Sequence, residues 1–392
     1  MAGGASSFRP VNETVQERYE HILRWFLARQ HRNGSWGSGN DKLTYTAQAI
    51  QVMHAAGFER DEKRVKKARR WLEDHANKQD KHRFSRLEVA LLLGDLPRQE
   101  SDSAAHELRD FLGALDSQLT NPAKLQIEDF FLWHALPTLI AMRPYEEELR
   151  KAGLISDVPH DKVMGTLQSI TTVFVGGGRR AVWGQPNHTG LAALYLHSIR
   201  DVKGLSPDPG ELSNSMVEWL IEDRATGLDF GWDHSHGITS YVLIDLVGVG
   251  ADEHPDIRGE LPEIVQFLAP SSGPLPGDRR ITFATALHTQ PLYATALALR
   301  ALSTVMSKYQ PDDLRRCRSN AERMLRERSL PARAMDAARR RGSALPWALA
   351  ALPVVLAAIL WGFDASELGA MFGSAGIGAL LALGLSRLQR NN

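Results

Sequence analysis

The chain has 392 residues, of which 43% are hydrophobic and 23% are charged, enough apolar material for one large domain or two smaller ones. Its formal net charge is zero, which argues against nucleic acid as a partner because phosphate binding requires a basic face. The lone cysteine, Cys317, excludes an internal disulfide and a cysteine-rich zinc site. Residues 1–11 lack an apolar stretch, so we expect a flexible N-terminus without a signal peptide, and a cytoplasmic main domain.

From residue 12 to residue 330, two classes of helix alternate with a period of roughly fifty residues. The first class is amphipathic, with one apolar stripe and one charged face, and belongs on an outer surface. The second class is almost free of charge and rich in alanine, leucine and threonine, which indicates burial on every side. The outer class is predicted at 12–30, 61–75, 102–119, 160–174, 208–223, 259–269 and 311–328, and the inner class at 45–56, 85–94, 127–141, 188–200, 236–249 and 288–305.

Pairing each buried helix with an amphipathic one predicts an all-α domain over 12–330, in which the pairs close into an (α/α)6 toroid. An open solenoid of the same hairpins is the structural alternative, and the sequence leaves it open. The turns before the inner helices combine glycine, which permits a tight exit from an outer helix, with tryptophan, which fills the gap between hairpins. These turns are Gly34-Ser35-Trp36-Gly37, Trp183-Gly184 and Gly231-Trp232.

Three short patterns carry a resemblance to a known superfamily. They are Gln30-xxx-Gly34-x-Trp36, the core of a QW motif; Lys67-Ala68-xx-Trp71-Leu72, similar to the front half of that motif; and the inner-helix start Thr46-Ala47. With them the chain resembles the terpenoid cyclase and protein prenyltransferase superfamily, of which squalene–hopene cyclase is a member, as a single toroid. The resemblance implies an isoprenoid substrate.

The catalytic motifs of that superfamily are missing from the chain. There is no Asp-x-Asp-Asp motif, with which hopene-type cyclases protonate a polyene, and no Asp-Asp-x-x-Asp motif for magnesium. The pair Asp312-Asp313 opens an outer helix, which indicates N-terminal capping. Protein prenyltransferases hold zinc with Asp, Cys and His, and Cys317 lies on the last outer helix, so that site cannot be reproduced. Whether the chain is an enzyme is therefore left open.

The candidate site comes from the amino ends of the inner helices, which in a toroid point at one mouth of the central cavity and favour an anion. Three of these helices begin with histidine, and an arginine pair precedes two of the histidines at the same spacing, as would suit a phosphate or carboxylate. The predicted acid–base residues are His188, Asp233, His236 and His288. The predicted substrate contacts are Arg179, Arg180, Arg279, Arg280, Tyr45, Glu128, Asp129 and Tyr293.

Three interpretations of this cluster stay open. In the first, the arginines are solvated loop residues and the histidines cap helices. In the second, the cluster binds an isoprenoid or other lipid that carries a diphosphate. In the third, the three histidines bind a divalent metal, and Asp233 is a fourth ligand or hydrogen-bonds to a ligand. The metal requires bonds near ~2.1 Å, which helix ends on adjacent spokes are poorly placed to provide. The cofactor is therefore unknown.

After a basic linker, 331–343, the composition changes abruptly. Ala344–Gly362 and Leu368–Ser386 are uncharged stretches of nineteen residues each, close to the ~20 that cross a hydrocarbon core. The arginine-rich linker and the basic tail, 387–392, predict cytoplasmic ends for a transmembrane hairpin over 344–386. The glycines of the second span are compatible with a homo-oligomer formed in the bilayer. A pair of buried helices in a soluble protein is the alternative.

Two functions follow from this organisation. The first is a membrane-anchored enzyme of the cyclase or prenyltransferase type, which acts on an isoprenoid or other lipid-phosphate substrate at the cytoplasmic membrane face. The second is a non-catalytic toroid that works as a membrane-tethered scaffold, sensor or effector, for example in phage defence. The shape of the centre discriminates between them, because an enzyme needs a lined cavity whereas a scaffold can be packed solid.

Overall fold

The computed structural model describes residues 8–75, 84–97, 99, 102–120, 134–170, 172–175, 179–183, 185–224, 231–233, 235–269 and 291–340. The chain divides into two units, Met1–Ala321 and Glu322–Asn392, and the helix α15 runs from the first into the second. The first unit contains the helical repeat.

The predicted all-α class is confirmed, because helices make up about three quarters of the described residues and one short two-stranded ribbon is the other regular structure among them. The helices predicted as inner are α2 (Lys42–Ala55), α4 (Ser85–Leu92), α7 (Leu136–Met142), α10 (Pro186–Ser198), α12 (His236–Val249) and α14 (Pro291–Tyr309). The other α-helices are α1 (Glu13–Leu27), α3 (Lys63–His75), α5 (Ser103–Thr120), α8 (Glu146–Lys151), α9 (His160–Ile170), α11 (Pro209–Asp223), α13 (Pro255–Leu268) and α15 (Pro311–Arg340). Short 3-10 turns lie at η1 (Gly39–Asp41), η6 (Arg143–Tyr145) and η7 (Ala251–Glu253).

Several helices begin where their sequences provide a capping side chain or a proline. The side chain of Asn12 accepts a hydrogen bond from the N–H of Val15 at the start of α1, and Ser235 does the same for Ile238 in α12. Proline occupies the first position of α10, where its missing N–H costs nothing and its fixed φ suits a helix. Local signals thus fix most helix starts within a few residues of the predicted ones.

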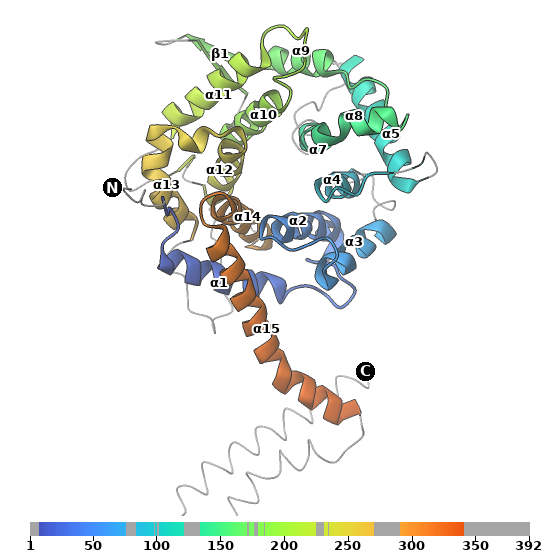
Figure 1. Cartoon of the computed structure of the whole chain (residues 1–392), viewed down its shortest axis with the longest axis vertical. Coiled ribbons are helices and arrows are strands. Elements are labelled where there is room, and N and C mark those ends of the chain that lie inside the picture. Colours follow the sequence, from blue (N-terminus) through green and yellow to red (C-terminus); the bar gives the residue numbers. More distant parts are fainter. Residues whose placement is uncertain are drawn as a thin grey trace, which may run out of the picture. The chain divides into compact units, whose positions relative to one another are not determined.

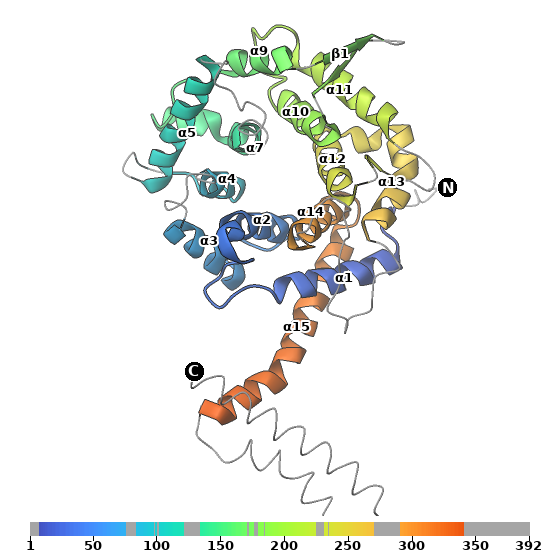
Figure 2. The same cartoon turned by 180° about the vertical axis from the view of Figure 1, so that it is seen from behind.

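The six inner helices contact one another in cyclic order. Each inner helix packs against the next one in the series α2, α4, α7, α10, α12, α14. The last of these, α14, packs against the first, α2. Figures 1 and 2 show these helices as an inner circle, with α1, α3, α5, α9, α11 and α13 outside it. Helices far apart in sequence, α2 and α14, are therefore neighbours.

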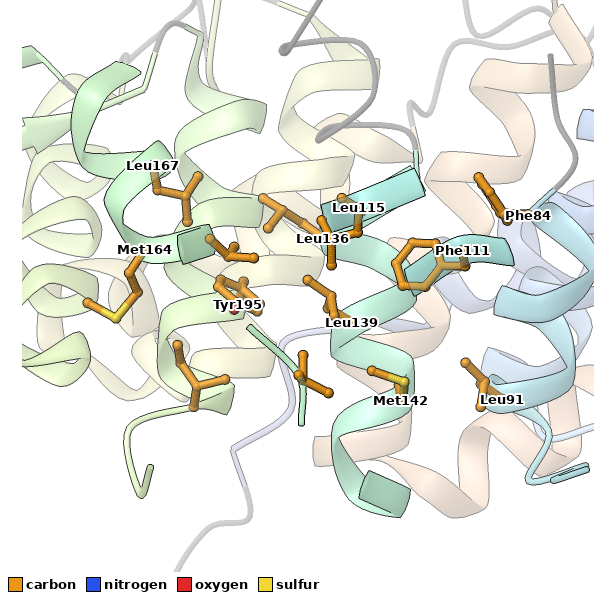
Figure 3. Packing of buried hydrophobic residues seen from close by; sticks show 14 of the residues in the cluster. Phe84, Leu91, Phe111, Leu115, Leu136, Leu139, Met142, Met164, Leu167 and Tyr195 are labelled. Atoms are coloured by element: carbon orange, nitrogen blue, oxygen red, sulfur yellow. The ribbon is translucent and has the colours of Figure 1, made fainter. Parts of the chain in front are cut away.

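The hydrophobic core lies between the two layers. Figure 3 shows side chains of α5 and α9, such as Phe111 and Met164, directed toward those of α4, α7 and α10, such as Leu139. An outer helix buries a single stripe: in α3 the buried residues are Val65, Ala68, Trp71 and Leu72. Inner α12 buries most of its length, as its even apolar composition predicts.

A repeated contact joins each of three tryptophan turns to the inner helix that follows. In every case the tryptophan is fully buried, and its backbone N–H donates to the hydroxyl of an inner-helix threonine over 3.0 Å. The hydroxyl supplies an acceptor to an N–H that no helix pairs, and the indole fills the space between hairpins. The pairs are Trp36–Thr46, Trp183–Thr189 and Trp232–Thr239.

The QW-like pattern also has a structural role. The Gln30 side-chain amide donates to the carbonyl of Gly34 over 3.2 Å and to that of Arg64, in α3, over 3.0 Å. Gly34 has φ +104°, and a Cβ at this position would lie 2.3 Å from the carbonyl oxygen of Lys67. Only glycine therefore allows this turn to lie against the next outer helix.

The structure differs from the prediction at four places. The outer helix expected at 160–174 ends at Ile170, and β1 (Thr172–Val175) pairs antiparallel with β2 (Arg179–Val182), because the β-branched run 171–175 favours extended backbone. The helix α8 and its 3-10 turn η6 were not predicted. The linker expected at 331–343 is helical as far as Arg340, and Val11, in the segment expected to be flexible, is buried and donates to Gln310 over 2.9 Å.

Within the described residues no helix is both long and apolar enough to cross a bilayer. The hairpin predicted at 344–386 lies outside the described residues.

Candidate functional site

A cavity of about 200 Å³ lies at the centre of the inner circle, and all six inner helices contribute to its wall. Its apolar part comes from alanine, leucine, isoleucine and proline side chains such as Ala47, Ala141 and Leu191. Its polar part comprises Thr44, Gln48 and Gln51 of α2, Glu88 of α4, Asn187 of α10, Tyr241 and Asp245 of α12, and Arg300 of α14.

One polar bridge joins three of these helices across the cavity wall. The Gln51 side-chain amide donates to Glu88 Oε1 over 2.6 Å, and its oxygen accepts from the Arg300 guanidinium over 3.0 Å. The glutamine thus separates an acid and a base that would otherwise pair directly. Such a bridge holds α2, α4 and α14 in register, since each buried group obtains a partner only when all three are in place.

Asp245 is the second acid of the cavity. Its side chain is 5% exposed, and within the described part of the chain its Oδ2 atom is buried without a hydrogen-bond partner. The same oxygen lies against Gly190 of α10, where a Cβ would approach it to 2.8 Å. Gly190 therefore makes room for the carboxyl group.

Burial shifts the pKa of both acids upward. It raises the pKa of Asp245 to about 8, while the positive charge of Arg300 acts in the opposite direction. It raises the pKa of Glu88 to about 7, opposed by Arg300 and by the hydrogen bond from Gln51. At neutral pH Asp245 is therefore largely protonated and can donate a proton, whereas Glu88 is poised between its two forms.

Further polar oxygens of the wall are unpaired. Thr44 Oγ1, Gln48 Oε1 and Asn187 Oδ1 are buried and, among the described residues, lack a hydrogen-bond partner. Leaving a buried polar group unsatisfied typically costs roughly 1–3 kcal/mol. Their position on one cavity with Asp245 indicates that the wall is built to meet a polar group.

Of the predicted site residues, the two tyrosines lie beside this cavity. The Tyr293 hydroxyl forms a hydrogen bond of 2.5 Å with that of Tyr241, which lines the wall. Tyr45 is buried close by; burial raises its pKa, and the charges of Asp41 and Tyr293 add to the effect. Tyr293 therefore supports the wall through its hydrogen bond with Tyr241.

Two of the predicted histidines, His188 and His236, are described by the structure, and neither is part of the cavity wall. His236 stacks on Phe267 of outer helix α13, with ring centroids 4.1 Å apart, and burial lowers its pKa. His188 lies beside Trp183, with centroids 5.3 Å apart. The third member of the predicted set, His288, lies outside the described residues, as do Arg279, Arg280, Glu128 and Asp129.

The remaining predicted residues lie outside the inner helices, in a turn and on a strand. Asp233 is exposed with φ 49° and adds its charge to the burial that raises the pKa of Asp223. Arg179 and Arg180 are on β2, where their backbones pair with Val175 and Phe174. Among the described residues no three His, Cys, Asp or Glu side chains lie close enough together to hold a metal ion.

Comparison with protein-family models, curated proteins and solved structures finds no match for this chain.

Gln51, Glu88, Asp245 and Arg300 were not predicted as site residues. The available signal was a charge or amide on a helix that is otherwise apolar, as for Asp245 in α12 and Arg300 in α14. Gln51, Asp245 and Arg300 also occupy the same position counted from the first residue of their helices. The repeat thus marked a site deeper along the helices than the amino ends.

Proposed function

We propose that the first unit is an (α/α)6 toroid of the terpenoid cyclase and protein prenyltransferase type. Three observations support this class: the cyclic contacts of the inner helices, the outer helices around them and the QW-like turn at Gln30 and Gly34. We further propose that the hairpin expected at 344–386 tethers this unit to the cytoplasmic face of a membrane, and that the unit binds and acts on an isoprenoid lipid taken from that membrane.

The observation that carries the proposal is a protonatable acid, Asp245, in a cavity that all inner helices line. A neutral carboxylic acid in such a place donates a proton to an alkene carbon or to a leaving oxygen, and an apolar wall keeps the product cation from water. Glu88, whose pKa is about 7, is the other acid of the described wall and the candidate to take a proton up again. Acid–base chemistry on an isoprenoid is therefore the reaction class we favour.

Multi-ring cyclisation fits the cavity poorly. Such reactions stabilise a series of carbocations on aromatic faces, and Tyr241 is the one aromatic residue of the described cavity wall. Tyr195, on inner helix α10, is hydrogen-bonded to His160 of outer helix α9 and is not part of the described cavity wall. A single protonation or transfer step places less demand on the wall.

The scaffold alternative also has an observation in its favour. The bridge from Glu88 through Gln51 to Arg300 stabilises contacts among inner helices, as a non-catalytic ring would need. A scaffold, however, has no use for the unpaired carboxyl oxygen of Asp245.

Lipid that co-purifies with the detergent-extracted full chain tests the proposal. Mass spectrometry should identify an isoprenoid in the wild type and much less in Ala141→Phe, which fills the cavity. The exposed substitution Ala152→Phe is the matched control and should retain the lipid. An isoprenoid carried equally by all three proteins, or by none, would contradict binding in the cavity.

A further inference from the structure

The wall of the cavity also bears on the head group of its ligand. Building on the proposed function, we infer that the cavity binds an isoprenoid alcohol, with the hydroxyl group donating to the acceptor oxygens of Asn187, Gln48 or Asp245, and that it does not bind the corresponding diphosphate. The inference rests on three properties of the described wall: its unpaired atoms, its charge and its size.

The unpaired atoms call for a hydrogen-bond donor. Asn187 Oδ1 is a carbonyl oxygen, which can only accept, and it is buried without a partner in the described structure. Gln48 Oε1 is also unpaired there, although the Gln48 side chain is hydrogen-bonded to Tyr293. Asp245 Oδ2, in a side chain only 5% exposed, is a third acceptor on the same wall. A ligand hydroxyl can donate to one of these oxygens and accept from a protonated Asp245. A phosphate oxygen can only accept, so it cannot donate to any of them.

The charge of the wall also disfavours an anion. Its described residues include one cation, Arg300, and two acids, Glu88 and Asp245. The guanidinium already donates to Gln51, whose amide binds Glu88, so its charge is shared within the bridge. A diphosphate would bury two or more negative charges beside a single guanidinium, which already donates to Gln51. An uncharged head group avoids this cost of removing charge from water.

The volume limits the part of the ligand that is enclosed. An engineered cavity of ~150 Å³ holds benzene, so about 200 Å³ suits roughly eight to ten heavy atoms. That is the hydroxyl end of a prenyl chain, somewhat less than two isoprene units. The ten-carbon alcohol geraniol is therefore the probe closest in size, and the far end of its chain would extend beyond the cavity.

The test measures binding of four probes to the full chain in lipid nanodiscs, by equilibrium dialysis with empty nanodiscs as the blank. The probes are geraniol, geranyl diphosphate, geranylamine and the parent hydrocarbon 2,6-dimethylocta-2,6-diene. We expect geraniol to bind at least about tenfold more tightly than the diphosphate and the hydrocarbon, which corresponds to one hydrogen bond of about 1.4 kcal/mol. It should bind no less tightly than geranylamine, whose ammonium group meets the positive charge of Arg300 on the same wall. In Asn187→Leu this preference over the hydrocarbon should shrink several-fold while the hydrocarbon still binds, which also shows that the cavity remains folded.

Exposed Asn214→Leu on α11 is the matched control and should leave all four affinities unchanged. Equal affinity for alcohol and hydrocarbon would overturn the inference while leaving isoprenoid binding intact. Tighter binding of the diphosphate or the amine would overturn the alcohol assignment in the same way. Failure of all four probes to bind would remove the proposed function and this inference together.

Discussion

A neutral Asp245 in the folded chain should make stability fall as the pH rises. Its pKa is about 8 in the folded chain against an ordinary value of 3.8, so between these values the folded state holds a proton that the unfolded state has lost. Each pH unit in that window removes up to about 1.36 kcal/mol, and the whole window up to roughly 6 kcal/mol. The loss begins near pH 4 and is complete near pH 8. Glu88, with a pKa near 7, adds a loss in the same direction.

Asp245→Asn keeps the shape of the side chain and removes its titration. Its free energy of unfolding, obtained from urea unfolding of the full chain in detergent followed by tryptophan fluorescence, should exceed that of the wild type at pH 8 by about 2–5 kcal/mol. At pH 5 the difference should be much smaller. Exposed Asp157→Asn is the matched control and should follow the wild type at both values. If Asp245→Asn and the wild type lose stability in parallel from pH 5 to pH 8, the carboxyl group is not protonated in the folded chain and the reasoning fails.

Two further predictions concern the tryptophan turns. Gly34→Ala should destabilise the chain by ~3 kcal/mol or more, because its Cβ would meet the Lys67 carbonyl. Gly39 also has a positive φ but has open space around it, so the control Gly39→Ala should cost about 1 kcal/mol. Equal urea midpoints for the two variants would refute the packing argument. Thr239→Val should cost about 1–3 kcal/mol by leaving the Trp232 N–H buried without an acceptor, and unchanged hydrogen exchange at that amide would show that another group replaces the hydroxyl.

The helices could be predicted because their signals are local. Even apolar composition distinguished α12 from the striped α3, and the glycine–tryptophan turns fixed where a hairpin ends. Closure of the ring depends on the contact of α2 with α14, which no local pattern encodes. The ribbon β1–β2 was missed for a different reason: the helical repeat was extended through a β-branched stretch at 171–175 that favours extended backbone.

The candidate site was predicted only in part. Helix dipoles favoured a site at the amino ends of the inner helices, but His236 at one of these ends stacks on Phe267 of an outer helix. The acids that line the cavity lie farther along the inner helices, and their partners come from other repeats, as Gln51 binds Glu88 and Arg300. A lone charge on an apolar helix marks such a position, but its partners depend on the three-dimensional packing.

Gly190 and Asp245 together argue that the cavity serves a ligand. A glycine within α10 gives up helix propensity worth about 1 kcal/mol, and the carboxyl group that it accommodates is buried with an unpaired oxygen, at a further cost. A ring that had only to close would be more stable with an apolar side chain facing an alanine. Asp245→Leu should therefore leave the full chain at least as stable as the wild type at pH 8, as judged by its urea midpoint, while abolishing any turnover or hydroxyl preference. A large loss of stability in this variant would instead show that the acid is needed for folding, and would favour the scaffold.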